Sequence, residues 1–133
     1  MFGFSKPKRP KVVAFDVIGT LFPLEPLRPS IVALGMPPSG LEGWFAAGCR
    51  DVFAMAAAGE YQPFATVLEA ALDQVLAEQG LHASTHDRKA LVSQIEELDA
   101  RAGTQEALAM LTSAGIPVMA LFRTVQSLRR KNF

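Results

Sequence analysis

Residues 12–22 read VVAFDVIGTLF, and this stretch decides how the rest of the chain is interpreted. An apolar run of β-branched and aromatic residues, bounded by Pro10 and Gly19, is typical of a short buried strand, here residues 11–16. Because the run is continuous rather than alternating, we expect a parallel strand covered on both faces. The strand ends in Asp16, which puts a carboxylate at the carboxyl end of a strand, where open α/β sheets keep their sites.

The turn after the strand, VIGT, has two interpretations. Gly19 allows close backbone approach, so the turn can aim its N–H groups at an anion, and Thr20 adds a hydroxyl. A carboxylate beside such a turn can attack carbon or phosphorus and form an ester that water later cleaves. The alternative is a strand-closing aspartate with an ordinary turn, and the short motif alone leaves both open.

The middle of the chain is predicted to be helical. Ser39 is a candidate cap, and Ser84 and Asp87 have capping-box spacing. The clearest apolar face at helical spacing lies in residues 63–80. The last predicted helix leads into the strand-like run IPVMALF at residues 116–122, as in the return leg of a βαβ unit. The expected helices are residues 30–35, 39–59, 63–80, 84–100 and 104–115.

The composition limits the classes of function. The chain has 133 residues, with 13 basic and 13 acidic side chains, so no overall field predicts a nucleic-acid or membrane partner. No apolar run is long enough to span a bilayer. The single cysteine, Cys49, excludes a disulfide framework, fits a cytoplasmic setting, and is expected to be a small core residue. His82 and His86 have no third ligand nearby in the sequence, so we expect solvated loop histidines and no metal site.

The motif and the order of elements together resemble a known superfamily. FDVIGTLF, residues 15–22, resembles the first motif of the haloacid dehalogenase-like (HAD) hydrolases. The helices after it resemble that superfamily's helical cap, and EYQPFATVLEAAL, residues 60–72, looks like a cap segment of the L-2-haloacid dehalogenase-like subgroup. TQEALAMLTSAGIPVMAL, residues 104–121, looks like the helix and strand that lead to the second motif.

The resemblance implies a fold class and residue roles. The fold would be α/β, an incomplete HAD-like Rossmannoid core, formed by the first strand and one helix–strand return, with a large helical cap inserted. Asp16 would be the nucleophile, and the backbone around Ile18, Gly19 and Thr20 would shape the pocket for an anionic small-molecule substrate. The superfamily's phosphatases carry a second Asp two residues after the nucleophile, whereas Ile18 cannot transfer a proton. This favours dehalogenase-like chemistry without a cofactor, and Mg²⁺ is expected only for a phosphatase-like reaction.

Two departures lower the activity that the resemblance implies. The dehalogenases place an Arg directly after the cap tryptophan, but Trp44 is followed by Phe45, and the nearby Arg50 is expected to be a solvated helix residue. The second motif should end its strand in Ser or Thr, whereas Phe122 occupies that position. The family's later Lys and acidic cluster have no counterpart, because Lys131 lies too near the strand.

The expected organisation has four parts: residues 1–10 form a disordered basic lead, 11–24 and 101–122 a partial α/β core, 25–100 the helical cap, and 123–133 a basic tail. A frameshift would account for the tail. One coding of ALFRTVQ, residues 120–126, read from its third base gives Ala-Leu-Ser-Asn-Gly-Ser, which is the expected second motif. The alternative is a genuine short protein with a basic tail.

We therefore predict a HAD-like hydrolase that forms a covalent aspartyl ester through Asp16. Low or no activity is expected, because the later motifs are missing and the chain looks truncated. The alternative is a non-catalytic helical interaction module or pseudoenzyme fragment. Two parallel strands would leave unpaired edges and an uncovered sheet face, so we also expect marginal stability and self-association through the sheet edge.

Overall fold

A computed structural model describes residues 7–121 of the chain, and the expectations for residues 1–6 and 122–133 lie outside the described residues. Strand β1 (Val13–Asp16) opens the fold and strand β2 (Val118–Leu121) closes it. The two strands pair in parallel, with Val13 opposite Val118 and Asp16 opposite Leu121. The parallel pairing expected from the continuous apolar run is therefore confirmed. Parallel strands need a long crossover connection, and the helices between β1 and β2 supply it.

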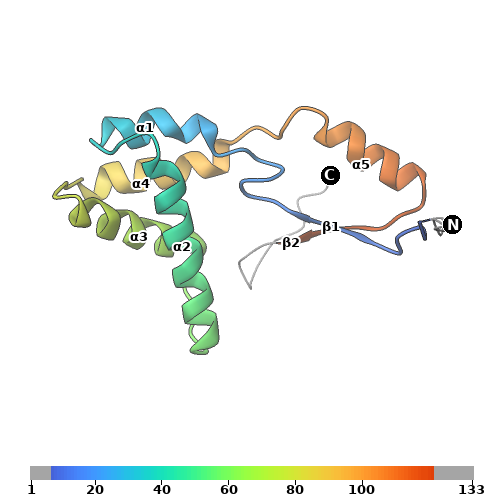
Figure 1. Ribbon diagram of the computed structural model, residues 1–133, viewed down its shortest axis with the longest axis horizontal. Helices are drawn as coiled ribbons and strands as arrows, with labels where there is room; N and C mark the ends of the chain where they lie inside the picture. Colours follow the sequence, from blue (N-terminus) through green and yellow to red (C-terminus); the bar gives the residue numbers. More distant parts are fainter. Residues whose placement is uncertain (1–6, 122–133) are drawn as a thin grey trace, which may run out of the picture.

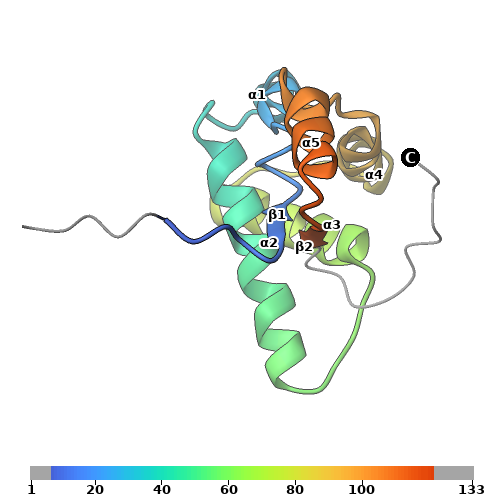
Figure 2. The ribbon, with the colours of Figure 1, turned by 90° about the vertical axis from the view of Figure 1, so that its right-hand side faces the viewer.

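The segment between the strands is helical, and Figure 1 shows its arrangement. Helices α1 to α4 are grouped on the left of this view, and α5, which precedes β2 in the chain, lies apart from them above the strands. Figure 2, viewed from the α5 side, has α5 in front of the other helices. The elements are η1 (Glu25–Leu27), α1 (Arg28–Ala33), α2 (Gly40–Ala57), α3 (Phe64–Glu78), α4 (Thr85–Ser93), η2 (Gln94–Glu97) and α5 (Thr104–Ser113).

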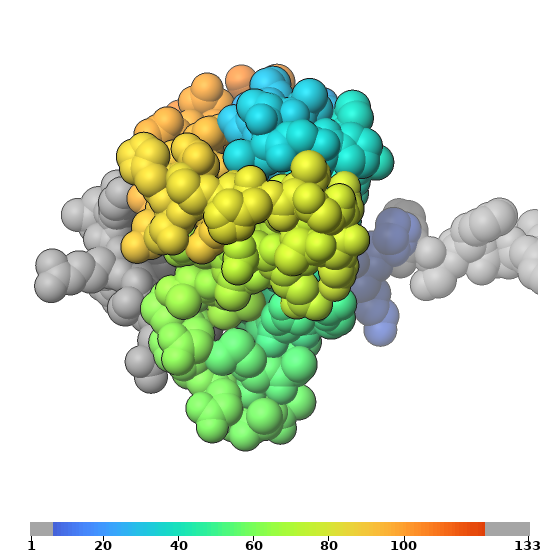
Figure 3. All heavy atoms as spheres, turned by 90° about the vertical axis from the view of Figure 1, so that its left-hand side faces the viewer, coloured from blue at the N-terminus to red at the C-terminus, as the bar shows by residue number. Residues whose placement is uncertain are grey.

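The hydrophobic core lies among α1 to α4 and not at the sheet. Figure 3 views these helices from the far side, where they form a continuous surface. The predicted apolar face of α3 supplies much of the core, because its apolar side chains recur every three or four residues and fall on one side of the helix. The fully or nearly buried members are Leu27, Ile31, Met36, Leu41, Trp44, Leu68, Ala71, Leu72, Leu76, Ala83, Leu91 and Val92.

Trp44 is the largest fully buried side chain and joins α2 to α3. Its exposed fraction is 0%, and its indole N–H donates a hydrogen bond of 2.8 Å to the carbonyl of Leu68. A Cβ at Gly48, one turn further along α2, would collide with the Leu68 side chain. Gly48 therefore allows α2 and α3 to approach closely near the point where Trp44 is hydrogen-bonded to Leu68.

The helix ends differ in part from the prediction. Ser84 caps α4 as expected, because its hydroxyl accepts a hydrogen bond of 3.0 Å from the Asp87 N–H. Ser39 does not cap α2: its backbone is already helical, at φ −66° and ψ −10°, and its side chain accepts no capping bond. The single helix predicted for residues 84–100 is wrong, since α4 ends at Ser93, η2 follows, and Leu98 is extended.

The strands are less covered than the sequence suggests. The expectation that the first strand is covered on both faces is wrong: β1 is half-buried for most of its length, and every residue of β2 is exposed. Met119 and Leu121 keep 55% and 54% of their surface exposed. Within the described residues the sheet has two strands. Each face of so narrow a sheet offers little surface against which a helix can pack. The α/β fold class, with a partial core and inserted helices, is confirmed.

The packing of Trp44 gives a stability prediction. Trp44→Phe removes the hydrogen bond to Leu68 and leaves a void, so we expect the free energy of unfolding to fall by about 2 kcal/mol. Urea denaturation followed by circular dichroism measures this change. The matched control is Tyr61→Phe at an exposed loop position, which should change the free energy by less than about 0.5 kcal/mol. Equal effects of the two substitutions would contradict the central role of Trp44.

Candidate active site

The turn after β1 is closed by hydrogen bonds onto one carbonyl. The Val17 oxygen accepts from the N–H groups of Thr20 (3.3 Å), Leu21 (2.9 Å) and Phe22 (3.0 Å). The N–H of Gly19 donates to the Phe22 oxygen at 2.8 Å. Gly19 has φ +88°, a backbone conformation that residues other than glycine rarely adopt. A Cβ atom at this position would meet its neighbours only at ordinary van der Waals distances. The positive φ angle therefore explains why glycine occupies this position, whereas a lack of room for a side chain does not.

Asp16 lies half-buried at the end of β1 and is held by the turn that follows it. The Thr20 hydroxyl donates a hydrogen bond of 2.8 Å to Oδ2 of Asp16. Within residues 7–121, Oδ1 has no side-chain partner. The threonine thus orients the carboxylate through one oxygen and leaves the other available.

Arg101 joins the far end of the helical segment to the same turn. Its backbone N–H donates to the Leu21 oxygen at 2.7 Å, and its Nε donates to the Thr20 oxygen at 3.0 Å. The bond to Thr20 connects residues 81 positions apart in the sequence. The two bonds bring the linker between η2 and α5 against the loop that carries Asp16.

An open cleft of about 780 Å³ lies between this turn and α2, within the size range of small-molecule sites. The lining residues come from the turn and the start of η1 and α1, from α2, and from Arg101 in the linker before α5. The full lining comprises Asp16, Ile18, Gly19, Thr20, Pro23, Leu24, Glu25, Arg28, Leu41, Glu42, Phe45, Ala46, Cys49, Arg50, Phe53 and Arg101.

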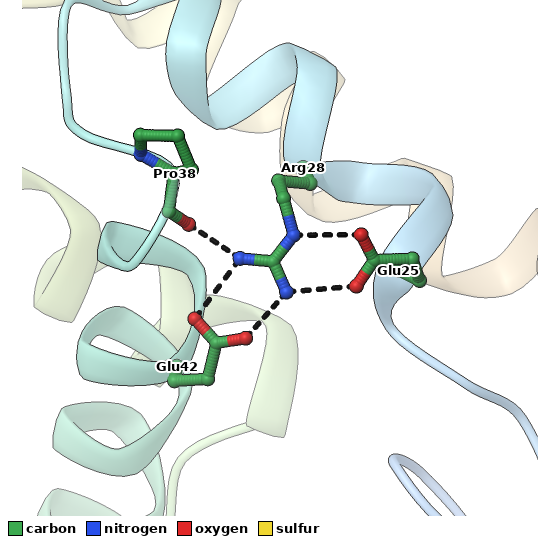
Figure 4. Close-up of polar contacts among 4 residues, drawn as sticks. All are labelled: Glu25, Arg28, Pro38 and Glu42. Carbon is green, nitrogen blue, oxygen red and sulfur yellow. Dashed lines mark hydrogen bonds and ion pairs between the residues drawn. The ribbon is translucent and has the colours of Figure 1, made fainter.

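Arg28 is bound by two carboxylates and a carbonyl, as Figure 4 shows. Its Nε and Nη2 each donate to a Glu25 oxygen at 2.7 Å, Nη1 donates to the Pro38 oxygen at 2.5 Å, and both terminal nitrogens contact Glu42. These hydrogen bonds raise the pKa of Arg28 and lower the pKa of Glu25. The hydrogen bond from Arg28 also lowers the pKa of Glu42 to about 2.

The α2 wall of the cleft is largely apolar. Phe45, at the position where the resemblance implies an arginine, is half-buried and packs edge-on against Phe64 with ring centroids 6.2 Å apart. Cys49 is buried, as predicted for a small core residue, but it also reaches the cleft. Arg50 is exposed, as predicted, and pairs with Asp51 at 2.9 Å. This wall suits the hydrocarbon part of a small ligand.

His82 and His86 are exposed and lie outside the cleft. In the described part of the chain, no three His, Cys, Asp or Glu side chains are grouped so that they could hold a metal ion. None of the helices within residues 7–121 has the length and apolar character to cross a membrane.

The four predicted site residues all line the cleft, but their roles stay predictions. The structure brings Asp16, Ile18, Gly19 and Thr20 together at the turn. The amides of Gly19 and Thr20 donate within the turn, so in this conformation they are not directed at an anion.

Three charged residues of the cleft, Arg28, Glu42 and Arg101, were not predicted from the sequence. Only the spacing of Glu25 and Arg28, three residues apart on one helical face, was a local signal for an ion pair. Glu42 and Arg101 reach the cleft through contacts between segments distant in the sequence, and no local pattern records such contacts.

Known structures share this architecture. No protein-family model and no curated protein matches the sequence. The fold is similar to that of the L-2-haloacid dehalogenase RSc1362, with a TM-score of 0.73 and 24% identity, over 86% of this chain and 53% of that protein. It is also similar to the L-2-haloacid dehalogenase from Xanthobacter autotrophicus, with a TM-score of 0.71 and 23% identity, over 86% of this chain and 47% of that protein.

These likenesses confirm the resemblance at the level of the fold. The chain spans about half the length of the dehalogenases that it matches. Its fold is therefore similar to that of about half of an L-2-haloacid dehalogenase.

The pKa of Glu42 leads to a prediction for acid stability. The folded-state pKa of about 2 lies below the ordinary value of 4.5, so the ion pair stabilises the fold above pH 4.5 and is lost as the pH falls through 2. We expect Glu42→Gln to flatten the fall of the urea midpoint between these two pH values.

Glu106→Gln, at an exposed position of α5, is the control. It should keep the pH dependence of the unmodified protein. A Glu42→Gln profile that overlays both of the others would mean that the ion pairs with Arg28 do not contribute to stability.

Proposed function

We propose that this chain carries the nucleophile half of a haloacid dehalogenase-like hydrolase, with Asp16 as the nucleophile. The observation that carries the proposal is the half-buried Asp16 carboxylate, oriented by Thr20 at the edge of a cleft. An oxygen of Asp16 would attack the halogen-bearing carbon, the carbon–halogen bond would break, and halide would leave. The product of this step is an aspartyl ester.

The fold similarity supports this chemistry. One of the similar structures is the Xanthobacter dehalogenase with chloropropionic acid covalently bound, and it matches this chain with a TM-score of 0.71 and 22% identity. Besides Asp16, the lining of the cleft includes the apolar side chains of Leu24, Leu41 and Phe45. A short 2-haloacid has a matching apolar body and a single charged group.

Hydrolysis of the ester is expected to be slow. Water must be activated by a base, and the carboxylates other than Asp16 that line the described cleft are Glu25 and Glu42. The pKa of each is lowered by Arg28, to about 2 for Glu42, which makes them weak bases at neutral pH. No lysine is found among the described lining residues. We therefore propose ester formation with little turnover for the chain of residues 1–133.

The identity of residue 18 bears on the cofactor. Ile18 lines the cleft where a phosphatase of the superfamily would carry a second acid, and its side chain cannot donate a proton to a leaving alkoxide. A halide ion leaves without protonation. The proposal is therefore a dehalogenase-like step without a cofactor, with Mg²⁺ relevant only to phosphate esters.

The test is a search for the covalent intermediate. Incubation with L-2-chloropropionate should give a protein whose mass increases by one propionate unit. Peptide mapping should put that unit on the peptide that contains Asp16, and Asp16→Asn should abolish it. Because ester breakdown is slow, the adduct should accumulate.

Cys49 provides the internal control, because its thiol also reaches the cleft and could be alkylated. Hydroxylamine cleaves an aspartyl ester but not a thioether, and Cys49→Ser should leave the adduct intact. An adduct that survives hydroxylamine, or that persists in Asp16→Asn, would mean that Asp16 is not the nucleophile.

The exposed sheet favours a second candidate, an interaction module that self-associates. β2 is exposed along its length, and Met110 of α5 keeps 74% of its surface exposed. Large patches of exposed apolar side chains mark association surfaces in soluble proteins. Such a module would use the sheet and α5, and it would not need Asp16.

Sedimentation velocity over a range of concentrations tests the second candidate. Self-association predicts a sedimentation coefficient that rises with concentration and falls back to that of a monomer when Met119 and Leu121 are both changed to Lys, since charges on an exposed strand oppose pairing. His82→Lys, at an exposed loop position, is the matched control. A concentration-independent monomer would contradict this candidate.

A further inference from the structure

The cleft beside Asp16 contains three arginines, Arg28, Arg50 and Arg101. They differ in how far their charge is already neutralised. Every nitrogen of the Arg28 guanidinium is engaged, by two glutamates and one carbonyl. Arg50 forms an ion pair with the adjacent Asp51 at 2.9 Å. Neither is an uncompensated cation.

Arg101 is different. Its Nε is fixed on the Thr20 carbonyl at 3.0 Å, and it forms no ion pair with any carboxylate among residues 7–121. Its two Nη groups have no hydrogen-bond partner among those residues. A guanidinium presents five N–H donors, so four of them remain for a ligand. The residue lies in the cleft lining together with Asp16.

The anchoring of Arg101 defines where a bound anion would lie. Two hydrogen bonds, from the backbone to Leu21 and from Nε to Thr20, hold Arg101 on the turn. The hydroxyl of the same Thr20 holds Asp16. The guanidinium and the carboxylate are thus both held by Thr20 without pairing with each other, and both line the same cleft.

We propose that Arg101 is the anion-binding residue of the cleft, with its Nη groups binding the carboxylate of a small carboxylic acid beside Asp16. The planar guanidinium matches a carboxylate in a two-bond arrangement. A monoanion also suits the local charge. Arg28 has two glutamate partners, so that group is net negative, and Asp16 adds to it. A dianionic phosphate would be repelled more strongly by these carboxylates, and Arg101 alone would not neutralise both of its charges.

The inference rests on the proposed function for the position of the site, but its test does not need the chemistry. The probe is propionate, which has no leaving group, titrated against the full chain by ligand-observed NMR, with neutral propionamide as the reference. The protein should bind propionate more tightly than propionamide. Arg101→Gln should weaken propionate binding roughly tenfold, the scale of one charge-assisted pair, and leave propionamide binding unchanged.

Three further variants make the test specific. Arg101→Lys keeps the charge without the planar fork, so it should recover part of the affinity. Lys89→Gln removes an exposed charge on α4 and should not change it. Asp16→Asn should still bind propionate, which separates failure of the nucleophile from failure of the anion site. Unchanged propionamide binding shows that the cleft of the Arg101 variants is intact.

Two results would overturn the inference. One is propionate affinity that is the same in Arg101→Gln as in the unmodified protein, or no better than that of propionamide. The other is inorganic phosphate binding more tightly than propionate in an Arg101-dependent way, which would identify the ligand class as a phosphate and not a carboxylate.

Discussion

The carbonyl of Val17 is the point on which the site depends. Three consecutive N–H groups, those of Thr20, Leu21 and Phe22, converge on it, and this closure requires the positive φ of Gly19. The closed turn puts the Thr20 hydroxyl on Asp16, and its carbonyls at residues 20 and 21 accept hydrogen bonds from Arg101. Those carbonyls are the acceptors that hold the returning chain, so the geometry of one turn orients the carboxylate and also fastens the end of the helical segment.

The molecule has a well-buried helical part and a largely exposed pair of strands. The helices between the strands enclose a core around Trp44 and α3, whereas β2 has no buried residue. Apolar burial is the main favourable term in folding, so the helical part supplies most of the stability, whereas β1 contributes Asp16 to the site. Near the site, Arg101 makes a polar contact across this division, through its hydrogen bond to the Thr20 carbonyl.

Much of the fold could be predicted because it is written in local patterns. The apolar period of residues 64–78 predicted α3, and Ser84 with Asp87 predicted the start of α4. The prediction failed where neighbouring segments decide the outcome. Ser39 has the right chemistry for a cap but a helical backbone. The helix expected to reach residue 100 ends at Ser93, and the chain past it is extended at Leu98 and bonds to the turn through Arg101.

The sequence by itself determined the elements that are formed by interactions between residues close in the sequence. These are the strand that ends in Asp16, the turn that needs Gly19, and the amphipathic helices. It also determined that Ile18 and Phe45 provide no charge where an acid and a cation were expected. Only the tertiary structure decided which charges meet in the cleft. Arg28 receives Glu42 from another helix, and Arg101 arrives at Thr20 from the opposite end of the helical segment. Such contacts depend on how whole helices pack, and residue order along the chain does not encode them locally.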